Sequence, residues 1–350
     1  ISYLGWEARA FCLLFSKKEV LYRKTFKFVK INKNMELTKK EIFEIARKFS
    51  LGKIKSCKII KGGLVNHNYL MKTETGKYII RIVGNNSPEK IKHLKLQFKI
   101  LNFLKEKDFP YKIPFPLKAN NSKEIIVFGK KRIWVYEMIE GTNRNRPNIL
   151  QIKQMAKALA TYHKYVKNLK GKTKVDNSNR RIQNSFKKMK IINGKTEADI
   201  LAIKYKDFFE ELFNKVKNIN LHTNSLFLHG DFDSSNVLFH NGKLNAIIDF
   251  DETSYSSRIF DISVSLRDSC YTQGKLDMRK IKIYLKEYEK IIKLSKKEKE
   301  NIIPIILYAN VDFFVWAYTD MKKEPENRKK YMKEMIILTE DIIDKNIKLA

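Results

Sequence analysis

The chain has 350 residues, of which 43% are hydrophobic and 12% aromatic. This length allows roughly two domains, and the composition excludes a largely disordered protein. The net charge of +33 comes from 71 Lys and Arg against 38 Asp and Glu. Because the lysines are spread over the whole length and alternate with glutamates, we favour a generally solvated basic surface over a nucleic-acid face. Short basic clusters such as residues 179–190 keep nucleic acid as the alternative.

Three cysteines, Cys12, Cys57 and Cys270, lie far apart and lack the spacing of a metal site or a disulfide framework. We therefore expect free thiols in a reducing cytoplasm. No apolar run reaches the ~18 residues of a membrane span, so no membrane partner is expected. Residues 1–34 precede the first methionine, and we expect them to be an extension that is disordered or translated from upstream sequence.

The first predicted elements form a small antiparallel sheet with one main helix. Residues 36–50 are expected to form a short helix, and residues 57–83 form strands with a hairpin at Thr75-Gly76. The next helix begins after Ser87, an N-cap residue followed by proline at the first helical position. Two further strands, joined by a Gly-Lys turn, complete an N-terminal lobe that we assign to residues 35–138.

Beyond Gly141 the pattern becomes mainly helical, and we assign residues 139–350 to a second, larger lobe. An amphipathic helix comes first, followed by a polar and basic segment at 168–198 that is a loop or a helical insertion. Residues 226–251 alternate between strands and loops. From residue 278 onward the pattern is helical, with breaks expected near Pro304 and Pro325.

Acidic residues gather in two adjacent stretches, "HGDFDSSN" and "AIIDFDE". Asp231 and Asn236 are separated by four residues, and a predicted hairpin turning at Asn241-Gly242 brings Asp249 back beside Asn236. Carboxylate and amide oxygens suit Mg²⁺, which also takes phosphate oxygens and water. The kinase template needs this set: an Asp that accepts the proton of the acceptor hydroxyl, an Asn on Mg²⁺, and a later Asp that bridges metal and phosphates.

With these residues in order, and Asp261 in "IFDISVSL" after them, the chain resembles the aminoglycoside phosphotransferase, choline kinase and homoserine kinase superfamily over about residues 40–345. The resemblance implies an α+β, two-lobed protein-kinase-like fold. It also implies an enzyme that transfers the γ-phosphate of ATP, with Mg²⁺, to a small-molecule hydroxyl.

The resemblance assigns roles to individual residues of the second lobe. Asp231 is the expected catalytic base, and Asn236 and Asp249 are the expected Mg²⁺ ligands. His229 is expected to brace the loop by hydrogen bonding rather than to carry protons, and Asp261 is expected to support the loop from below. Two readings of Asp251, a second-metal ligand and a solvated loop acid, stay open.

In the first lobe the stretch "KGGLVNHNY" resembles the loop that covers the nucleotide in this superfamily, with Gly63 and Asn66 as candidate phosphate contacts. Arg81 occupies the place of the phosphate-pairing lysine of protein kinases. Gln97 stands where the partner glutamate is usual, so no ion pair of that kind is expected. Backbone groups of Glu137 and Ile139 are expected to contact adenine at the hinge between the lobes.

The acceptor remains open at this level. Homoserine would need a cation for its carboxylate and an acid for its amine, whereas choline would need an aromatic cage. Residues 310–320 contain aromatic and acidic side chains that could form a cage, although helix core is the favoured reading. Candidate acceptor contacts are Asp233, Asp268, Tyr271 and Trp316. Homoserine and choline- or ethanolamine-like acceptors rank first, aminoglycosides or sugars second, and an inactive or nucleic-acid-binding relative is the alternative of another class.

Overall fold

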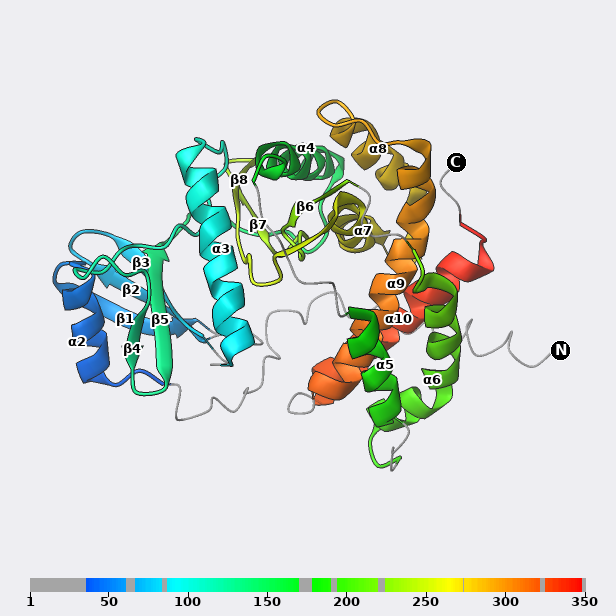
Figure 1. Ribbon diagram of the computed structural model, residues 1–350, viewed down its shortest axis with the longest axis horizontal. Coiled ribbons are helices and arrows are strands. Elements are labelled where there is room, and N and C mark those ends of the chain that lie inside the picture. The colour runs from blue at the N-terminus through cyan, green and yellow to red at the C-terminus, as the bar shows by residue number, and fades with distance from the viewer. Residues whose placement is uncertain are drawn as a thin grey trace.

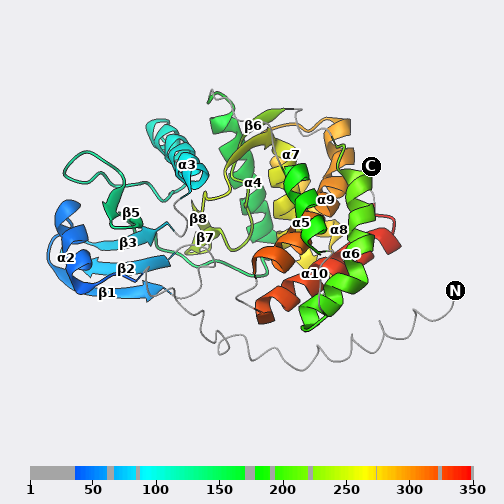
Figure 2. The ribbon, with the colours of Figure 1, turned by 60° about the horizontal axis from the view of Figure 1, so that its bottom comes forward.

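The computed structural model describes residues 36–60, 67–83, 87–169, 178–189, 194–219, 224–272, 274–321 and 325–347. The predicted extension at 1–34 lies outside these ranges, as do Gly63 and Asn66. Figures 1 and 2 show a small sheet-containing lobe beside a larger helical lobe. The two-lobed α+β fold expected from the sequence is therefore correct.

The N-terminal lobe is built on one antiparallel five-stranded sheet with strand order β1-β2-β3-β5-β4. Helix α2 packs against it, and its N-cap Thr38 forms a reciprocal capping box with Glu41. Met71, Ile80 and Val135 are buried in the core that the sheet and α2 share. The bounds are α2 Lys39–Lys48, β1 Ile54–Ile60, β2 His67–Thr73, β3 Lys77–Ile82, β4 Ile126–Phe128 and β5 Lys131–Glu137.

Helix α3 (Pro88–Glu106) lies between this sheet and the second lobe (Figure 1). The Ser87 side chain accepts a hydrogen bond from the Lys90 backbone, so the predicted N-cap is confirmed. Phe98 on α3 packs edge-on against Trp134 of β5, with 5.2 Å between ring centroids. This contact fixes the helix against the sheet and places its first turns near the acidic loops.

The C-terminal lobe packs its helices around three short two-stranded ribbons, β6-β9, β7-β8 and β10-β11. The predicted helical insertion is present as α5, which joins α6, α9 and α10 in a second hydrophobic cluster (Figure 2). The helices are α4 Ile149–Val166, α5 Ser178–Met189, α6 Glu197–Val216, α7 Arg258–Ser269, α8 Met278–Tyr288, α9 Lys296–Asp320 and α10 Pro325–Asp344. The strands are β6 Ser225–Leu228, β7 Val237–His240, β8 Lys243–Ile247, β9 Ser254–Ser257, β10 Tyr271–Thr272 and β11 Lys275–Leu276.

The predicted helix break near Pro304 is wrong, because α9 continues through this residue. A proline inside a helix removes one backbone hydrogen bond and costs about 3 kcal/mol. The neighbouring Ile303, Ile305 and Ile306 are buried, so burial of apolar surface outweighs that loss. Pro325, by contrast, is the first residue of α10. A backbone N–H at this position has no acceptor within the helix, so proline loses no hydrogen bond there.

Among the described residues one segment, Lys296–Thr319 of α9, is long and apolar enough to cross a membrane by composition. The sequence prediction missed this stretch. Of its most apolar window 67% is buried inside the protein, and α9 contacts α5, α6, α7 and α10. Core helices of soluble proteins pass the same test of composition, so this helix carries no argument for a membrane.

Candidate active site

The loop between β6 and β7 and the loop after β8 bring three of the predicted residues together. The Asn236 Nδ2 atom donates hydrogen bonds to the backbone oxygen and to the Oδ2 atom of Asp231, both at 2.9 Å. The β7-β8 hairpin pairs Val237 with Ile247, and the Ile248 backbone N–H donates to the Asn236 carbonyl at 2.9 Å. Asp249 therefore follows directly beside Asn236, as the hairpin in the sequence predicts.

Asp249 has a left-handed backbone, with φ of 62°. This conformation is uncommon for a residue other than glycine, and such residues cluster at functional sites. The Asp249 carboxylate accepts a hydrogen bond from Arg81 Nη2 at 2.9 Å, and its side chain is 40% exposed. The carboxylate thus faces both β3 and open space beside the catalytic loop.

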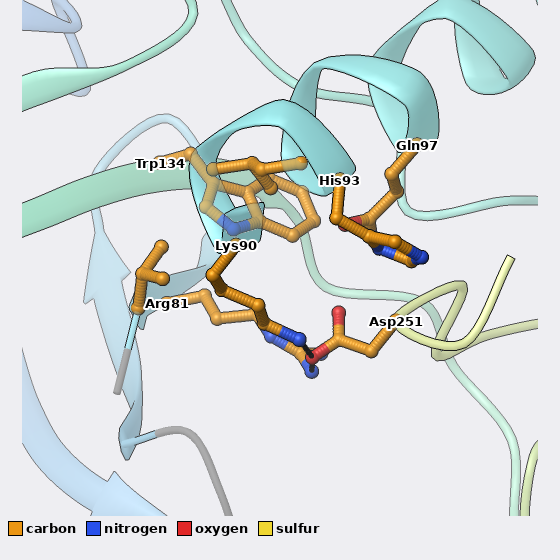
Figure 3. Close-up of a pocket in the computed structure, with 8 residues that line it drawn as sticks. Arg81, Lys90, His93, Gln97, Trp134 and Asp251 are labelled. Carbon is orange, nitrogen blue, oxygen red and sulfur yellow. Dashed lines mark ion pairs between the residues drawn. The ribbon is translucent and has the colours of Figure 1, made fainter. Parts of the chain in front are cut away.

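Arg81 is held by two carboxylates from the second lobe. Its Nη2 atom is 2.9 Å from Asp249 and 2.8 Å from Asp251, and its side chain is only 9% exposed. Burial opposes the charge of Arg81, but Asp249 and Asp251 raise its pKa above the ordinary value. Asp251 also lies 3.7 Å from the Lys90 ammonium of α3 (Figure 3). Asp251 is therefore ion-paired, not a solvated loop acid.

Gln97 forms no counterpart of the helix glutamate of protein kinases. It lines a small cavity together with Arg81, Lys90 and Asp251 (Figure 3). Its Nε2 atom is buried without a hydrogen-bond partner in the part of the chain described, as is the Trp134 Nε1 atom on the same cavity. The partners of Arg81 accordingly come from the loop after β8 rather than from α3.

His229 and Asp261 stabilise the loop between β6 and β7, which carries Asp231, through hydrogen bonds on its buried side. The Nδ1 atom of His229 accepts from the Asp231 backbone N–H at 3.3 Å, which leaves Nε2 to donate to the Ile248 carbonyl at 3.0 Å. The Asp261 carboxylate accepts from the backbone N–H groups of His229 and Gly230, each at 2.8 Å. Both side chains are fully buried.

Side chains of α4 and α8 extend the hydrogen-bond network around Asp261. His163 Nε2 lies 3.0 Å from the Asp261 carboxylate, and its Nδ1 atom lies 2.7 Å from the Tyr288 hydroxyl. Burial lowers the pKa of His163, although Asp261 opposes that shift. A neutral ring that donates to Asp261 and accepts from Tyr288 satisfies this buried chain of hydrogen bonds.

Gly230 is required by its surroundings. Its φ is +86°, and a Cβ atom at this position would lie 1.9 Å from the Glu252 carbonyl oxygen. Two loops, one carrying Asp231 and the other Asp249, therefore touch through backbone atoms. A larger residue would force them apart.

The carboxylates of Asp231 and Asp233 carry raised pKa values. Burial is the main cause for both, and the Asp249 charge adds to the shift of Asp231 while Asp231 and Asp268 add to that of Asp233. Raised pKa values of this kind are typical of sites that hold cations or transfer protons. Asp231 is thus suited to accept a proton.

The four candidate acceptor residues lie on different elements. Asp233 accepts from the backbone N–H and hydroxyl of Ser235, so its Oδ1 atom stabilises the catalytic loop. Asp268 on α7 accepts from the Ser234 backbone N–H at 2.8 Å. Tyr271 begins β10, and Trp316 is a half-buried residue of α9.

The predicted hinge between the lobes lies at the end of β5, and the backbone polar groups there decide whether it can bind adenine. Met138 donates its backbone N–H to Lys77 of β3 at 2.8 Å. Because successive residues of an extended chain direct their polar groups to opposite sides, those of Glu137 and Ile139 are directed away from β3. This arrangement is compatible with the predicted adenine contact, which remains a prediction.

The oxygen donors of this site fit a magnesium ion whose remaining ligands are phosphate oxygens and waters. The described residues contain no cluster of three or more His, Cys, Asp or Glu side chains with metal-site geometry. Asn236 and Asp249 offer two hard oxygen ligands, and Mg²⁺ usually takes one or two protein groups plus phosphate oxygens and waters. A nucleotide-dependent Mg²⁺ site fits this set, whereas an all-protein metal cage does not.

Residues 56–291 match the model of the phosphotransferase enzyme family. The chain belongs to this family. The phosphotransferase is 23% identical over 292 residues to a homoserine kinase of Caulobacter vibrioides, covering 83% of this chain and 90% of that protein. The homologues are kinases that act on small-molecule hydroxyls, and this chain is an enzyme of that class.

Solved structures show the same fold for this phosphotransferase. An amicoumacin kinase in complex with AMP-PNP and Ca²⁺ aligns with a TM-score of 0.64 at 14% identity, covering 90% of this chain and 95% of that one. The choline kinase of Cryptosporidium parvum aligns with a TM-score of 0.58 at 15% identity, covering 88% and 97% of the two chains.

Several residues that contact this site of the phosphotransferase were not predicted from its sequence. Lys90 and His163 are ordinary helix residues in the sequence, and only the packing of α3 and α4 brings them to Asp251 and Asp261. Gly230 carried a usable signal, because a glycine directly before an acidic residue in a loop suggests close backbone approach.

Proposed function

We propose that the enzyme transfers the γ-phosphate of ATP to a hydroxyl group of a small molecule, with Asp231 as the general base. The acceptor oxygen attacks the γ-phosphorus, its proton passes to the Asp231 carboxylate, and the bond to the ADP oxygen breaks. The observation that carries this proposal is the convergence of Asp231, Asn236, Asp249 and Arg81 at one place between the lobes.

The nucleotide would be held by Arg81, Gly63 and Asn66 and by the backbone of Glu137 and Ile139. The buried guanidinium of Arg81 suits phosphate oxygens, which it can bind with two parallel donors. Asn236 and Asp249 would hold Mg²⁺, which neutralises the phosphate charge when it is bound. Asn236 can serve because its Nδ2 atom is committed to Asp231, which leaves the amide oxygen for a cation.

Homoserine and choline- or ethanolamine-like alcohols rank first among the candidate acceptors. Homoserine kinases among the relatives and the choline kinase among the solved structures support this ranking. Aminoglycosides or sugars stand second, supported by a spectinomycin phosphotransferase with a TM-score of 0.62. The free thiols of Cys57 and Cys270 support a place in the cytoplasm.

The test is a screen for ADP release and phosphorylated product over homoserine, choline, ethanolamine, methylthioribose, hexosamines and aminoglycosides. Asp231→Asn is expected to bind ATP with Mg²⁺ as the wild type does and to lose at least ~100-fold in turnover, the low end for removal of a general base. Unchanged turnover of this variant would refute the role of Asp231. Thermal stabilisation by ATP and Mg²⁺ without transfer to any alcohol would favour an inactive relative instead.

A further inference from the structure

Arg267 stands beside the catalytic loop without a partner of its own. It lies in the last turn of α7, next to Asp268, whose carboxylate accepts from the Ser234 backbone N–H. Within the described ranges the guanidinium of Arg267 takes part in no ion pair and no hydrogen bond. Five other arginines of the described chain are paired with carboxylates: Arg47, Arg81, Arg181, Arg258 and Arg328.

Among the described residues the guanidinium of Arg267 has an aromatic contact. Its Cζ atom lies 5.2 Å from the centroid of the Phe313 ring on α9. Phe313 in turn packs against Trp316 and Tyr331, with centroid distances of 5.1 and 5.5 Å. These three rings and Arg267 are half-buried. An arginine can lie over an aromatic ring and still use the N–H donors along the edge of its guanidinium for another group.

The charge of Arg267 reaches both the catalytic loop and α10. Burial raises the pKa of Asp231, and Arg267 is among the charges that oppose this shift. Burial likewise raises the pKa of Glu334 on α10, where Lys330 and Arg267 oppose it and Asp268 adds to it. The charge of Arg267 therefore acts on the proposed base and on Glu334, and Arg267 directly precedes Asp268 on α7.

This end of α7 belongs to the helical lobe and not to the sheet lobe that carries Arg81. Arg81 of β3 already provides a buried guanidinium for phosphate beside Asp249. Arg267 comes instead from α7 and lies over Phe313 of α9, and both helices belong to the helical lobe (Figure 1). A half-buried guanidinium with free N–H donors matches a carboxylate, which it can hold with two parallel hydrogen bonds.

The same contacts argue against a choline cage. A quaternary ammonium would need the faces of the aromatic rings, and the face of Phe313 is already taken by a cation. A second cation placed there would be repelled by Arg267. The acids Asp268 and Glu334 suit a primary ammonium group better, because an ammonium donates hydrogen bonds to carboxylates.

We propose that the acceptor is a hydroxy amino acid whose carboxylate binds Arg267, whose ammonium faces Asp268 and Glu334, and whose hydroxyl faces Asp231. This inference rests on the proposed function and narrows it to homoserine-like acceptors. Arg267 determines specificity and takes no part in the proton transfer.

The test compares two alcohols that differ in the carboxylate alone, L-homoserine and 3-aminopropan-1-ol, on the wild type and on Arg267→Met. Methionine keeps an unbranched side chain over Phe313 and removes the charge. The variant is expected to lose about 10- to 100-fold in kcat/KM for homoserine, mainly through KM, because one charge-assisted pair is lost. Its kcat/KM for 3-aminopropan-1-ol is expected to stay within a few-fold of wild type.

Binding supplies a second readout. Calorimetric titration of homoserine into the protein saturated with AMP-PNP and Mg²⁺ is expected to show the same loss for Arg267→Met and a partial loss for Arg267→Lys. Arg279→Met, at an exposed position of α8, is the matched control and is expected to bind homoserine as the wild type does.

Three outcomes would overturn the inference while leaving phosphotransfer intact. They are equal losses on both alcohols, a preference of the wild type for choline or ethanolamine, and a rise in KM for ATP alone, which would place Arg267 on a nucleotide phosphate. Absence of transfer to every alcohol tested would instead contradict the proposed function, and the inference with it.

Discussion

Arg81 on β3 and Asp249 after β8 are 168 residues apart in the sequence, yet their side chains meet at 2.9 Å. This pair joins the two lobes at the loop that follows β8. Because Asp251 contacts the same Arg81 nitrogen at 2.8 Å, two carboxylates share one guanidinium. The two acids differ in surroundings, since Asp249 is 40% exposed and Asp251 is 16% exposed and also near Lys90.

Substitutions of these two aspartates should therefore have unequal effects. Asp251→Asn is expected to raise KM for ATP and lower kcat/KM about 10-fold, because Arg81 loses a residue that orients it. Asp249→Asn should lower kcat/KM much further, because it removes a proposed metal ligand as well. Steady-state kinetics at varied ATP and Mg²⁺ would decide. Lys92→Met, at an exposed position of α3, serves as the control with near-wild-type kinetics, and an Asp251→Asn loss as large as that of Asp249→Asn would contradict the division of roles.

Gly230→Ala should separate the two loops of the site. The new Cβ would lie 1.9 Å from the Glu252 carbonyl oxygen, so the backbone must move. We expect a loss of about 2 kcal/mol or more in the free energy of unfolding, measured in urea, together with lower activity. Gly242→Ala is the matched control, because its φ is also positive, at +76°, but nothing lies within 4 Å of its Cβ. That variant should lose only about 1 kcal/mol, and equal losses would rule out the close approach as the cause.

Asp261→Asn should be severely destabilising although the shape of the side chain is conserved. Each carboxylate oxygen of Asp261 accepts from a backbone N–H, and His163 lies beside one of them. The amide nitrogen of asparagine would face a donor, so we expect a loss of about 3–5 kcal/mol. Tyr288→Phe removes only the far end of this chain and should cost about 1 kcal/mol. Urea unfolding of both variants checks the contrast, which a similar stability of the two would contradict.

The raised pKa of Asp231 predicts how stability depends on pH. A carboxyl whose pKa is higher in the folded state than its ordinary value of 3.8 binds its proton more tightly when folded. The contribution of Asp231 to the stability of the wild type should therefore fall as the pH rises from about 3.8 through the folded pKa. Asp231→Asn does not titrate, so its stability relative to wild type should increase over this window and stay constant above it. Unfolding free energies measured from acid to neutral pH test this, and a difference that shrinks with rising pH would contradict it.

Local patterns predicted the elements that depend on local chemistry. The cap at Ser87 and the β7-β8 hairpin follow from residues within a few positions of one another, and the hairpin alone places Asp249 beside Asn236. The partners of Arg81 depend instead on how two lobes pack, and no short pattern contains that information. The continuation of α9 through Pro304 was mispredicted for a related reason, because distant packing outweighed a local preference.

Within the described ranges no helix carboxylate is paired with Arg81. In protein kinases the equivalent ion pair reaches from the sheet to a helix, and activity depends on the position of that helix. Here the pair reaches from the sheet to the loop after β8, and α3 adds Lys90 at 3.7 Å from Asp251. The contacts of Arg81 with Asp249 and Asp251 therefore do not depend on an ion pair with α3.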